Sequence, residues 1–338
     1  MSFTYAYRYP LGTGVELEGV VELEPVEPGA LTYRGGYVSV KGKRQVELSV
    51  THSAATEAFI YLGKVSAKGA LREILDTEED QAVLPGQLVL GAERTRLVME
   101  GVADCMRSPA FAGLFDSYGA GEVAVFPVLR EGMKYGLGEA VLGASGYLCD
   151  EIVADAHHVA DASVPDLGRR MELTVFKDAD LSPEERAAVK VAVIGDSVAS
   201  GTVIIGLVDE IAKRFPNLER VELVAPLAAV YGLARIAAFA RQDIPVRIHC
   251  FETLLNALKP DYYYSPHFSE PEMHICPEAE ASYREWWGRD AKGRWIADTA
   301  CSGYGWSEAF FNPGKQLRMI DEELTRRHGL SLADVLSR

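Results

Sequence analysis

The chain has 338 residues, of which 48% are hydrophobic and 9% aromatic, so it is long enough for one large domain with an appendage or for two medium domains that share a core. Its 49 acidic and 34 basic residues leave a formal charge of −15, which argues against a nucleic-acid-binding surface and against docking on anionic lipid. The sequence has no apolar run of transmembrane length and no signal-peptide pattern at its N-terminus. We therefore expect a globular, cytoplasmic protein without nucleic-acid or membrane partners.

The five cysteines are odd in number and scattered along the chain, and they lack the paired short spacing of zinc sites, so reduced thiols are expected. Cys301, beside Ser302, is a candidate nucleophile, but no base can be assigned to it and an incidental thiol is the stronger interpretation. The sequence marks no third ligand beside its two close His and Cys pairs and so argues against a metal there. These pairs are His249 with Cys250, and His274 with Cys276.

The first 120 residues fall into two parts. Residues 1–51 alternate polar and apolar positions in short runs separated by turns, which predicts an antiparallel β meander. Residues 52–120 have a longer period and are expected to form a helical connector. The stretch 88–106 has an apolar helical stripe that we interpret as a candidate seam between subunits. The stripe consists of Leu90, Leu97, Val98, Val102 and Met106.

Residues 121–251 alternate short apolar runs with helical segments. Buried strands separated by helices predict an α/β fold, a mostly parallel sheet with helices on both faces. In such sheets ligands bind at the carboxyl ends of the strands. The strands are expected at 123–128, 146–153, 171–176, 191–194, 221–225 and 246–251, and the helices at 132–143, 202–215 and 229–241.

Residues 252–338 lose this rhythm. The part up to residue 316 is rich in Tyr, Trp and Phe, and we interpret it as an aromatic cap over the sheet that stacks on a flat acceptor, although such clusters are more often simply core. The remainder has the pattern of a charged amphipathic helical tail.

The clearest chemistry lies directly after the run 191–194, in the loop from Gly195 to Thr202. A strand, a turn of small residues and a helix start bring free backbone N–H groups and the positive end of a helix to one point, which suits a phosphate. Asp196 would be repelled by phosphate and is expected to accept hydrogen bonds from sugar hydroxyls beside it. The alternative is that Asp196 and Ser200 are only a turn residue and a helix N-cap. The predicted phosphate-binding residues are Ser197, Val198, Ala199, Ser200, Gly201 and Thr202.

This loop resembles the signature of type I phosphoribosyltransferases, in which a hydrophobic strand meets two acids and a few small residues, and its end from Ser200 to Val203 is most similar to the orotate type. A second segment at 126–133, Phe-Pro-Val-Leu-Arg-Glu-Gly-Met, resembles the pyrophosphate loop Pro-Ile-Leu-Arg-Ala-Gly of uracil phosphoribosyltransferases. The resemblance makes Arg130 the pyrophosphate clamp, since a guanidinium fork suits phosphate oxygens. The alternative is a surface ion pair with Glu131 or Glu139. The implied pyrophosphate-binding residues are Leu129, Arg130, Glu131 and Gly132.

Two further segments extend the resemblance. The runs on either side of 154–170 are similar to the hairpin that flanks the family's flexible catalytic loop, which implies such a loop there. The segment 295–305 loosely resembles the family's uracil-recognition stretch, and the alternative is an ordinary aromatic cap with glycine turns. The implied loop carries His157, His158, Arg169 and Arg170, which either contact pyrophosphate on closure or are simply solvated. The implied acceptor-binding residues are Ala300, Cys301, Ser302, Gly303 and Tyr304.

The resemblance implies transfer of a 5-phosphoribosyl group from phosphoribosyl pyrophosphate to an atypical, aromatic or heterocyclic acceptor. It implies Mg²⁺ as cofactor, Asp196 and Arg130 as catalytic residues with Asp196 also on the metal, and a homodimer. Gly195 stands where the family has its first acid, so this chain matches neither the uracil nor the purine pattern. Two alternatives therefore stay open: a non-catalytic regulator that binds a ribosyl phosphate, and phosphorolysis or hydrolysis of a nucleotide.

Overall fold

The computed structural model describes most of the chain up to residue 254 and short stretches beyond it. Of the cap and tail expected at residues 252–338, it describes little more than the strand pair β12 (His267–Phe268) and β13 (Trp295–Ile296). None of the helices in the described part of the chain is long and apolar enough to cross a membrane. The described residues are 3–11, 16–24, 32–60, 91–164, 168–175, 180–252 and 254, with isolated positions between 267 and 334.

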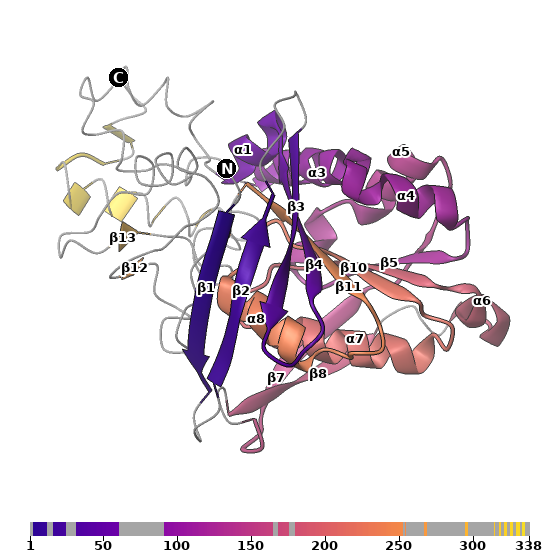
Figure 1. Ribbon diagram of the computed structural model, residues 1–338. Helices are drawn as coiled ribbons and strands as arrows, with labels where there is room; N and C mark the ends of the chain where they lie inside the picture. The colour runs from indigo at the N-terminus through magenta and orange to yellow at the C-terminus, as the bar shows by residue number, and fades with distance from the viewer. Residues whose placement is uncertain are drawn as a thin grey trace.

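One nine-stranded sheet forms the centre of the molecule, in the order β1-β2-β3-β4-β11-β10-β9-β5-β6 (Figure 1). Neighbouring strands from β4 to β6 are parallel, whereas β1 to β4 form an antiparallel meander. The predicted α/β fold, a mostly parallel sheet with an N-terminal meander, is therefore confirmed. The strands are β1 (Phe3–Pro10), β2 (Glu16–Leu23), β3 (Thr32–Val40), β4 (Val46–His52), β5 (Val123–Pro127), β6 (Asp150–Glu151), β9 (Val191–Gly195), β10 (Arg220–Val224) and β11 (Val246–Phe251).

The meander continues the same sheet as the parallel strands. β4 pairs in parallel with β11, and Leu48 lies opposite Ile248 in that pair. In β2, Leu17, Val21 and Leu23 are buried while the residues between them are more exposed, which is the period of two expected for a strand with one covered face. The N-terminal strands thus widen the sheet beyond β11.

The central strands β5 and β9 are buried on both faces, which explains their continuous apolar sequences. In β9, Val191 and Val193 pack with helices α3, α4 and α5, whereas Ala192 and Ile194 pack with α7 and α8. The two groups of helices lie on opposite sides of the sheet in Figure 1. The helices are α1 (Ala54–Ile60), α3 (Gly91–Arg107), α4 (Pro109–Ser117), α5 (Leu137–Ser145), α6 (Pro183–Ala188), α7 (Thr202–Arg214) and α8 (Val230–Phe239).

The apolar stripe of α3 faces the core of its own chain. Leu97, Val98, Val102 and Met106 are buried in the cluster that covers one face of the sheet. Since strands and helices of the same chain already cover this stripe, its interpretation as a seam between subunits is wrong. Leu90 lies outside the described residues.

The helix expected at 132–143 is interrupted. A short 3₁₀ helix, η2 (Glu131–Lys134), comes first, and α5 begins only after Gly136. Gly136 has a φ of 60°, a left-handed conformation that glycine adopts without a steric penalty. The interruption lets the first turn after β5 bend away from the direction of α5.

The catalytic loop expected at 154–170 is largely a hairpin. β7 (Ala154–Ala160) pairs antiparallel with β8 (Arg169–Val175), so that only a short connection remains at its tip. The strand expected at 146–153 shrinks to β6, because Gly146 ends α5 in a left-handed conformation and a bend follows. Both sequence boundaries were therefore wrong by several residues.

A buried polar chain crosses three adjacent strands of the sheet. Ser49 Oγ lies 2.6 Å from His249 Nδ1, and His249 Nε2 lies 2.7 Å from Glu222 Oε2. Neutral His249 with its proton on Nε2 donates to Glu222 and accepts from Ser49, so it satisfies both neighbours. Among the described residues no group of three or more His, Cys, Asp and Glu side chains lies together so as to hold a metal ion. His274 and Cys276 lie outside the described residues.

Acidification should destabilise the fold through His249. Burial holds the pKa of His249 below its ordinary value, so the unfolded chain binds the proton more readily than the folded chain. We expect the free energy of unfolding to fall as the pH drops below about 6.5, by at most about 1.4 kcal/mol per pH unit from this side chain. Urea unfolding across this range measures the slope. His249→Gln should flatten it and the exposed control His157→Gln should not; equal slopes in all three proteins would refute this role.

Candidate functional site

The carboxyl ends of β5 and β9 meet at the point where the strand order reverses. β5 lies between β9 and β6, and Pro127 at its end lies opposite Gly195 at the end of β9. The loop after β5 and the loop after β9 therefore start side by side. Open parallel sheets bind their ligands at such a switch point, because the two loops diverge there.

The two loops are in direct backbone contact. The N–H of Val128 donates to the carbonyl oxygen of Gly195 over 3.0 Å. A Cβ atom on Gly132 would overlap that same carbonyl oxygen, and one on Gly195 would lie 2.8 Å from Leu137 Cδ1 and 3.1 Å from the Tyr135 ring. Leu137 and Tyr135 thus fill the space beside residue 195, which gives a physical reason for a glycine at this position.

The predicted phosphate loop lies between β9 and α7, but its free amides are fewer than expected. The N–H of Ser197 donates to Asp196 Oδ1 over 2.9 Å, and the N–H of Val198 donates to the carbonyl of Leu227 over 2.9 Å. These two amides already have an acceptor, so their binding of phosphate stays a prediction that would require them to exchange partners. In the described part of the chain the amides of Ala199 and Gly201 have no acceptor.

The helix start completes this seat. Gly201, with a φ of 72°, is the N-cap of α7, and the first helical hydrogen bond runs from the N–H of Ile205 to its carbonyl. The first amides of α7 therefore point beyond the helix end, where an anion is stabilised. Ser200 is not the N-cap; its Oγ lies 3.0 Å from Thr202 Oγ1.

Arg235 on α8 is buried and supports this loop, although the sequence analysis did not single it out. Arg235 is 4% exposed, and its Nε donates to the carbonyl of Ser200 over 2.9 Å. Gly232, one turn earlier, lets α8 approach closely, because a Cβ there would overlap the carbonyl of Ala199. The guanidinium adds positive charge behind the seat. The sequence could have indicated this role, because Arg235 is the single charged residue in the otherwise apolar sequence of α8.

Two carboxylates and two hydroxyls gather beside the seat. Ser197 Oγ donates to Glu131 Oε2 over 2.9 Å and lies 3.0 Å from the hydroxyl of Tyr135. Burial and the charge of Glu131 raise the pKa of Asp196 well above its ordinary value, and burial likewise raises that of Tyr135. Glu131 is 7% exposed, so its negative charge acts on Asp196 with little screening. The site therefore concentrates negative charge next to a positive seat.

Of the predicted pyrophosphate-binding residues, Glu131 and Gly132 are buried, whereas Arg130 is exposed to solvent. Leu129 and Arg130 are joined by a cis peptide bond, and the N–H of Leu129 donates to the carbonyl of Ala154 over 2.7 Å.

The hairpin starts beside the loop after β5, and two of its predicted residues have partners on the hairpin itself. His157 lies 3.4 Å and Arg170 2.7 Å from Glu172 on the same hairpin. Burial lowers the pKa of His158. The predicted acceptor-binding residues lie outside the described residues. They are Ala300, Cys301, Ser302, Gly303 and Tyr304.

No protein-family model matches the chain, and no curated protein shows significant similarity to it. Three solved structures are similar over part of their length. The AQ2163 protein from Aquifex aeolicus is 16% identical with a TM-score of 0.35, over 59% of this chain and 88% of that one. A hypoxanthine phosphoribosyltransferase from Staphylococcus aureus is 14% identical with a TM-score of 0.28, over 44% and 73%.

A hypothetical protein from Neisseria gonorrhoeae, solved with bound ppGpp, is 10% identical with a TM-score of 0.30, over 51% of this chain and 89% of that one. All three TM-scores are below 0.5, so none of these similarities assigns a function to this chain.

The contact between the two loops should be sensitive to one added methyl group. Gly132→Ala should lower the free energy of unfolding by about 2 to 3 kcal/mol, because the new Cβ meets backbone atoms that cannot yield. Gly143→Ala is the matched control. It lies in α5 with nothing near its Cβ position and should stabilise by about 0.5 to 1 kcal/mol. Chemical denaturation measures both, and a neutral Gly132→Ala would show that the loops are not in contact.

Removing a carboxylate from the site should stabilise the fold. The raised pKa of Asp196 means that its charge costs stability as the pH rises above the ordinary pKa. Asp196→Asn should therefore raise the free energy of unfolding at pH 7 by about 1 to 3 kcal/mol, and the gain should vanish toward about pH 4. Denaturation at both pH values measures it, with the exposed Asp116→Asn as control. A loss of stability at pH 7 would contradict the assigned environment.

Proposed function

We propose that this protein is a phosphoribosyltransferase that moves a 5-phosphoribosyl group from phosphoribosyl pyrophosphate to an atypical aromatic or heterocyclic acceptor and releases pyrophosphate. One observation carries the proposal. At the switch point of the sheet, an anion seat at the start of α7 lies beside the half-buried Asp196 and the buried Glu131. A sugar phosphate needs that pair of environments, one positive for its phosphate and one negative for its hydroxyls.

The 5'-phosphate fits the seat formed by the amides of Ala199, Gly201 and the first turn of α7. The dipole of α7 favours a negative charge there, and Arg235 lies behind the loop. The carboxylate of Asp196, one residue after β9, then accepts hydrogen bonds from the ribose hydroxyls. These contacts hold the anomeric carbon in one place relative to both loops.

The site also fits the divalent cation that the resemblance implies. Asp196 and Glu131 offer carboxylate oxygens, the hard donors that Mg²⁺ prefers, and their mutual repulsion is relieved by a cation. These two residues would hold Mg²⁺, which would neutralise charge on the departing pyrophosphate. Asp196 thus serves both the ribose and the metal.

In the transfer, the bond between the anomeric carbon and the pyrophosphate oxygen breaks, and a bond to a nitrogen or carbon atom of the acceptor forms. Positive charge develops on the ribose as pyrophosphate leaves with the bonding electrons. Asp196 and Glu131 stabilise that positive charge, and the exposed guanidinium of Arg130 binds the leaving pyrophosphate in bidentate fashion.

Glu131 favours transfer over the non-catalytic alternative. Its carboxylate comes from the loop after β5 and reaches Ser197, the second residue of the phosphate loop. A second acid is thus present although Gly195 has none. The regulator remains the competing hypothesis, and it predicts binding of the donor without release of pyrophosphate.

The proposal predicts acceptor-dependent release of pyrophosphate when the protein is incubated with phosphoribosyl pyrophosphate, Mg²⁺ and a panel of heterocycles. Asp196→Asn, Glu131→Gln and Arg130→Gln should each lower kcat/KM by about 10²-fold, because each removes a charge that acts on the transition state. A coupled pyrophosphate assay measures the rates.

Glu139→Gln is the matched control for Glu131→Gln, since it is an exposed carboxylate on α5, and it should keep the full rate. Donor binding without release from any acceptor would replace the enzyme with the regulator. Hydrolysis or phosphorolysis of a nucleotide at the same residues would replace transfer with the third hypothesis, and absence of any binding would reject all three.

A further inference from the structure

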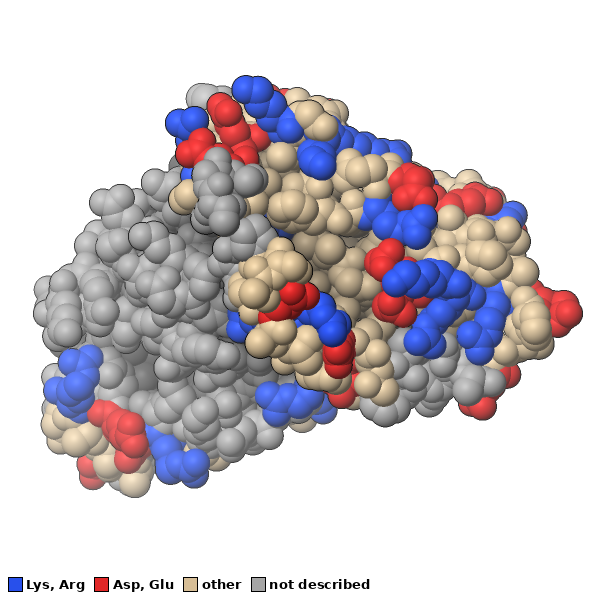
Figure 2. All heavy atoms as spheres, turned by 90° about the horizontal axis from the view of Figure 1, so that it is seen from below, with Lys and Arg blue, Asp and Glu red and all other residues tan. Residues whose placement is uncertain are grey.

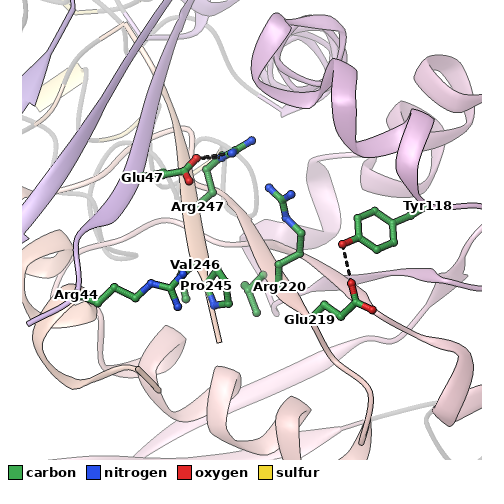
Figure 3. A pocket seen from close by; sticks show the side chains of 9 residues that line it. Arg44, Glu47, Tyr118, Glu219, Arg220, Pro245, Val246 and Arg247 are labelled. Atoms are coloured by element: carbon green, nitrogen blue, oxygen red, sulfur yellow. Dashed lines mark hydrogen bonds and ion pairs between the residues drawn. The ribbon is translucent and has the colours of Figure 1, made fainter. Parts of the chain in front are cut away.

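A polar cavity lies at the amino ends of the parallel strands, whereas the candidate site lies at their carboxyl ends. The cavity has a volume of about 300 Å³ and is found where β10 and β11 begin, beside the first residues of β4 and the end of α4. Its position at the amino ends of the parallel strands separates it from the loops after β5 and β9, which leave the carboxyl ends. Its polar lining consists of Arg44, Glu47, Tyr118, Glu219, Arg220 and Arg247 (Figure 3).

Three arginines from three different segments line this cavity. Arg220 starts β10, Arg247 is the second residue of β11, and Arg44 lies in the turn before β4. In Figure 3 the side chains of Arg220 and Arg247 rise on the same side of their strands. Glu222 lies opposite Arg247 in the register of β10 with β11, and Arg220 pairs with Glu222, which places the two arginines near the same point of the sheet.

The three guanidinium groups differ in how firmly they are held. Arg220 pairs with the buried Glu222, so it is fixed. Arg247 donates to the carbonyl of Ala110 over 2.8 Å and pairs with Glu47, whose side chain is 65% exposed. The Glu47 carboxylate is therefore a partner that an incoming anion can displace from Arg247.

Arg44 brings a charge that its neighbours leave uncompensated. Its guanidinium contacts the carbonyl oxygen of Gln242 at 3.4 Å, and within the described part of the chain it forms no ion pair. The basic side chains on the face shown in Figure 2 lie next to acidic ones. Arg220 is paired with Glu222 and Arg247 with Glu47, so among the described residues Arg44 supplies the one lining guanidinium that no carboxylate pairs with.

The remaining walls are largely apolar. Pro245, Val246 and the ring of Tyr118 line the cavity, and the Tyr118 hydroxyl donates to Glu219 over 2.8 Å. The volume is at the lower end of the range for small-molecule sites, which combine an apolar wall with a few converging polar groups. The cavity therefore has room for the body of a small molecule as well as for its charged group.

We propose that this cavity binds a small phosphate monoester. Its phosphate lies between Arg44 and the forks of Arg220 and Arg247, which match phosphate oxygens in bidentate fashion, and its remaining body contacts Tyr118 and Pro245. On binding, the phosphate takes the place of Glu47 at Arg247. The site is separate from the loops at the carboxyl edge, so this inference does not depend on phosphoribosyl transfer.

Calorimetric titration of the full chain with adenosine monophosphate and with inorganic phosphate tests the site, in the absence of divalent ions. The ester should bind more tightly than inorganic phosphate, because only the ester has a body for the apolar wall. Arg44→Glu should weaken the ester by roughly tenfold or more, since it removes a charged donor and adds a repulsive group. Glu47→Gln should strengthen it by about threefold, since Arg247 loses its competing carboxylate.

The controls separate this site from general charge effects and from the other edge of the sheet. Arg8→Glu makes the same change of charge on the exposed strand β1 and should bind as the wild type does. Arg44 and Glu47 are exposed or largely exposed, so both variants should fold. Unchanged binding in Arg44→Glu, an equal loss in Arg8→Glu, or no effect of Glu47→Gln would each overturn the proposal.

Discussion

The candidate site depends on the close approach of two backbone segments at the switch point of the sheet. The amide of Val128 donates to the carbonyl of Gly195, and Gly132 passes over that same carbonyl without a side chain. This contact fixes the loop after β5 against the loop after β9. It brings Glu131 within hydrogen-bonding distance of Ser197 and leaves Asp196 beside it in a poorly solvated environment. Without this contact, the loop that carries Glu131 would not be held against the loop that carries Asp196 and the anion seat.

The local sequence pattern was sufficient to predict those strands whose own residues show how deeply they are buried. β5 and β9 are buried on both faces and have unbroken apolar runs, and β10 and β11 are mostly apolar with a few polar positions, which made all four recognisable. The connection from β9 to α7 was also predicted from the sequence, because an apolar strand, a run of small residues and a helical pattern follow one another directly along the chain.

Other features depend on contacts between distant segments, which periodicity does not reveal. An apolar stripe on α3 has the same spacing whether its own chain or another subunit covers it, so the covering strands had to be seen. Ser197 bonds with Glu131 and Tyr135, more than sixty residues earlier, and with them forms the polar part of the site. Strand β7 of the hairpin was missed, because its polar, half-exposed sequence resembles a loop in composition, whereas β8 was expected at 171–176.

The pairing of Val198 with the segment after β10 has a consequence for how the anion seat responds to a ligand. Val198 accepts a hydrogen bond from the N–H of Ala229 and donates one to the carbonyl of Leu227. Two backbone hydrogen bonds therefore hold the middle of the loop to the segment after β10. Such a seat is ordered when the protein folds. A ligand then meets amides that already point the right way and loses little affinity to ordering the loop. Substitutions near Leu227 would alter affinity without touching the ligand.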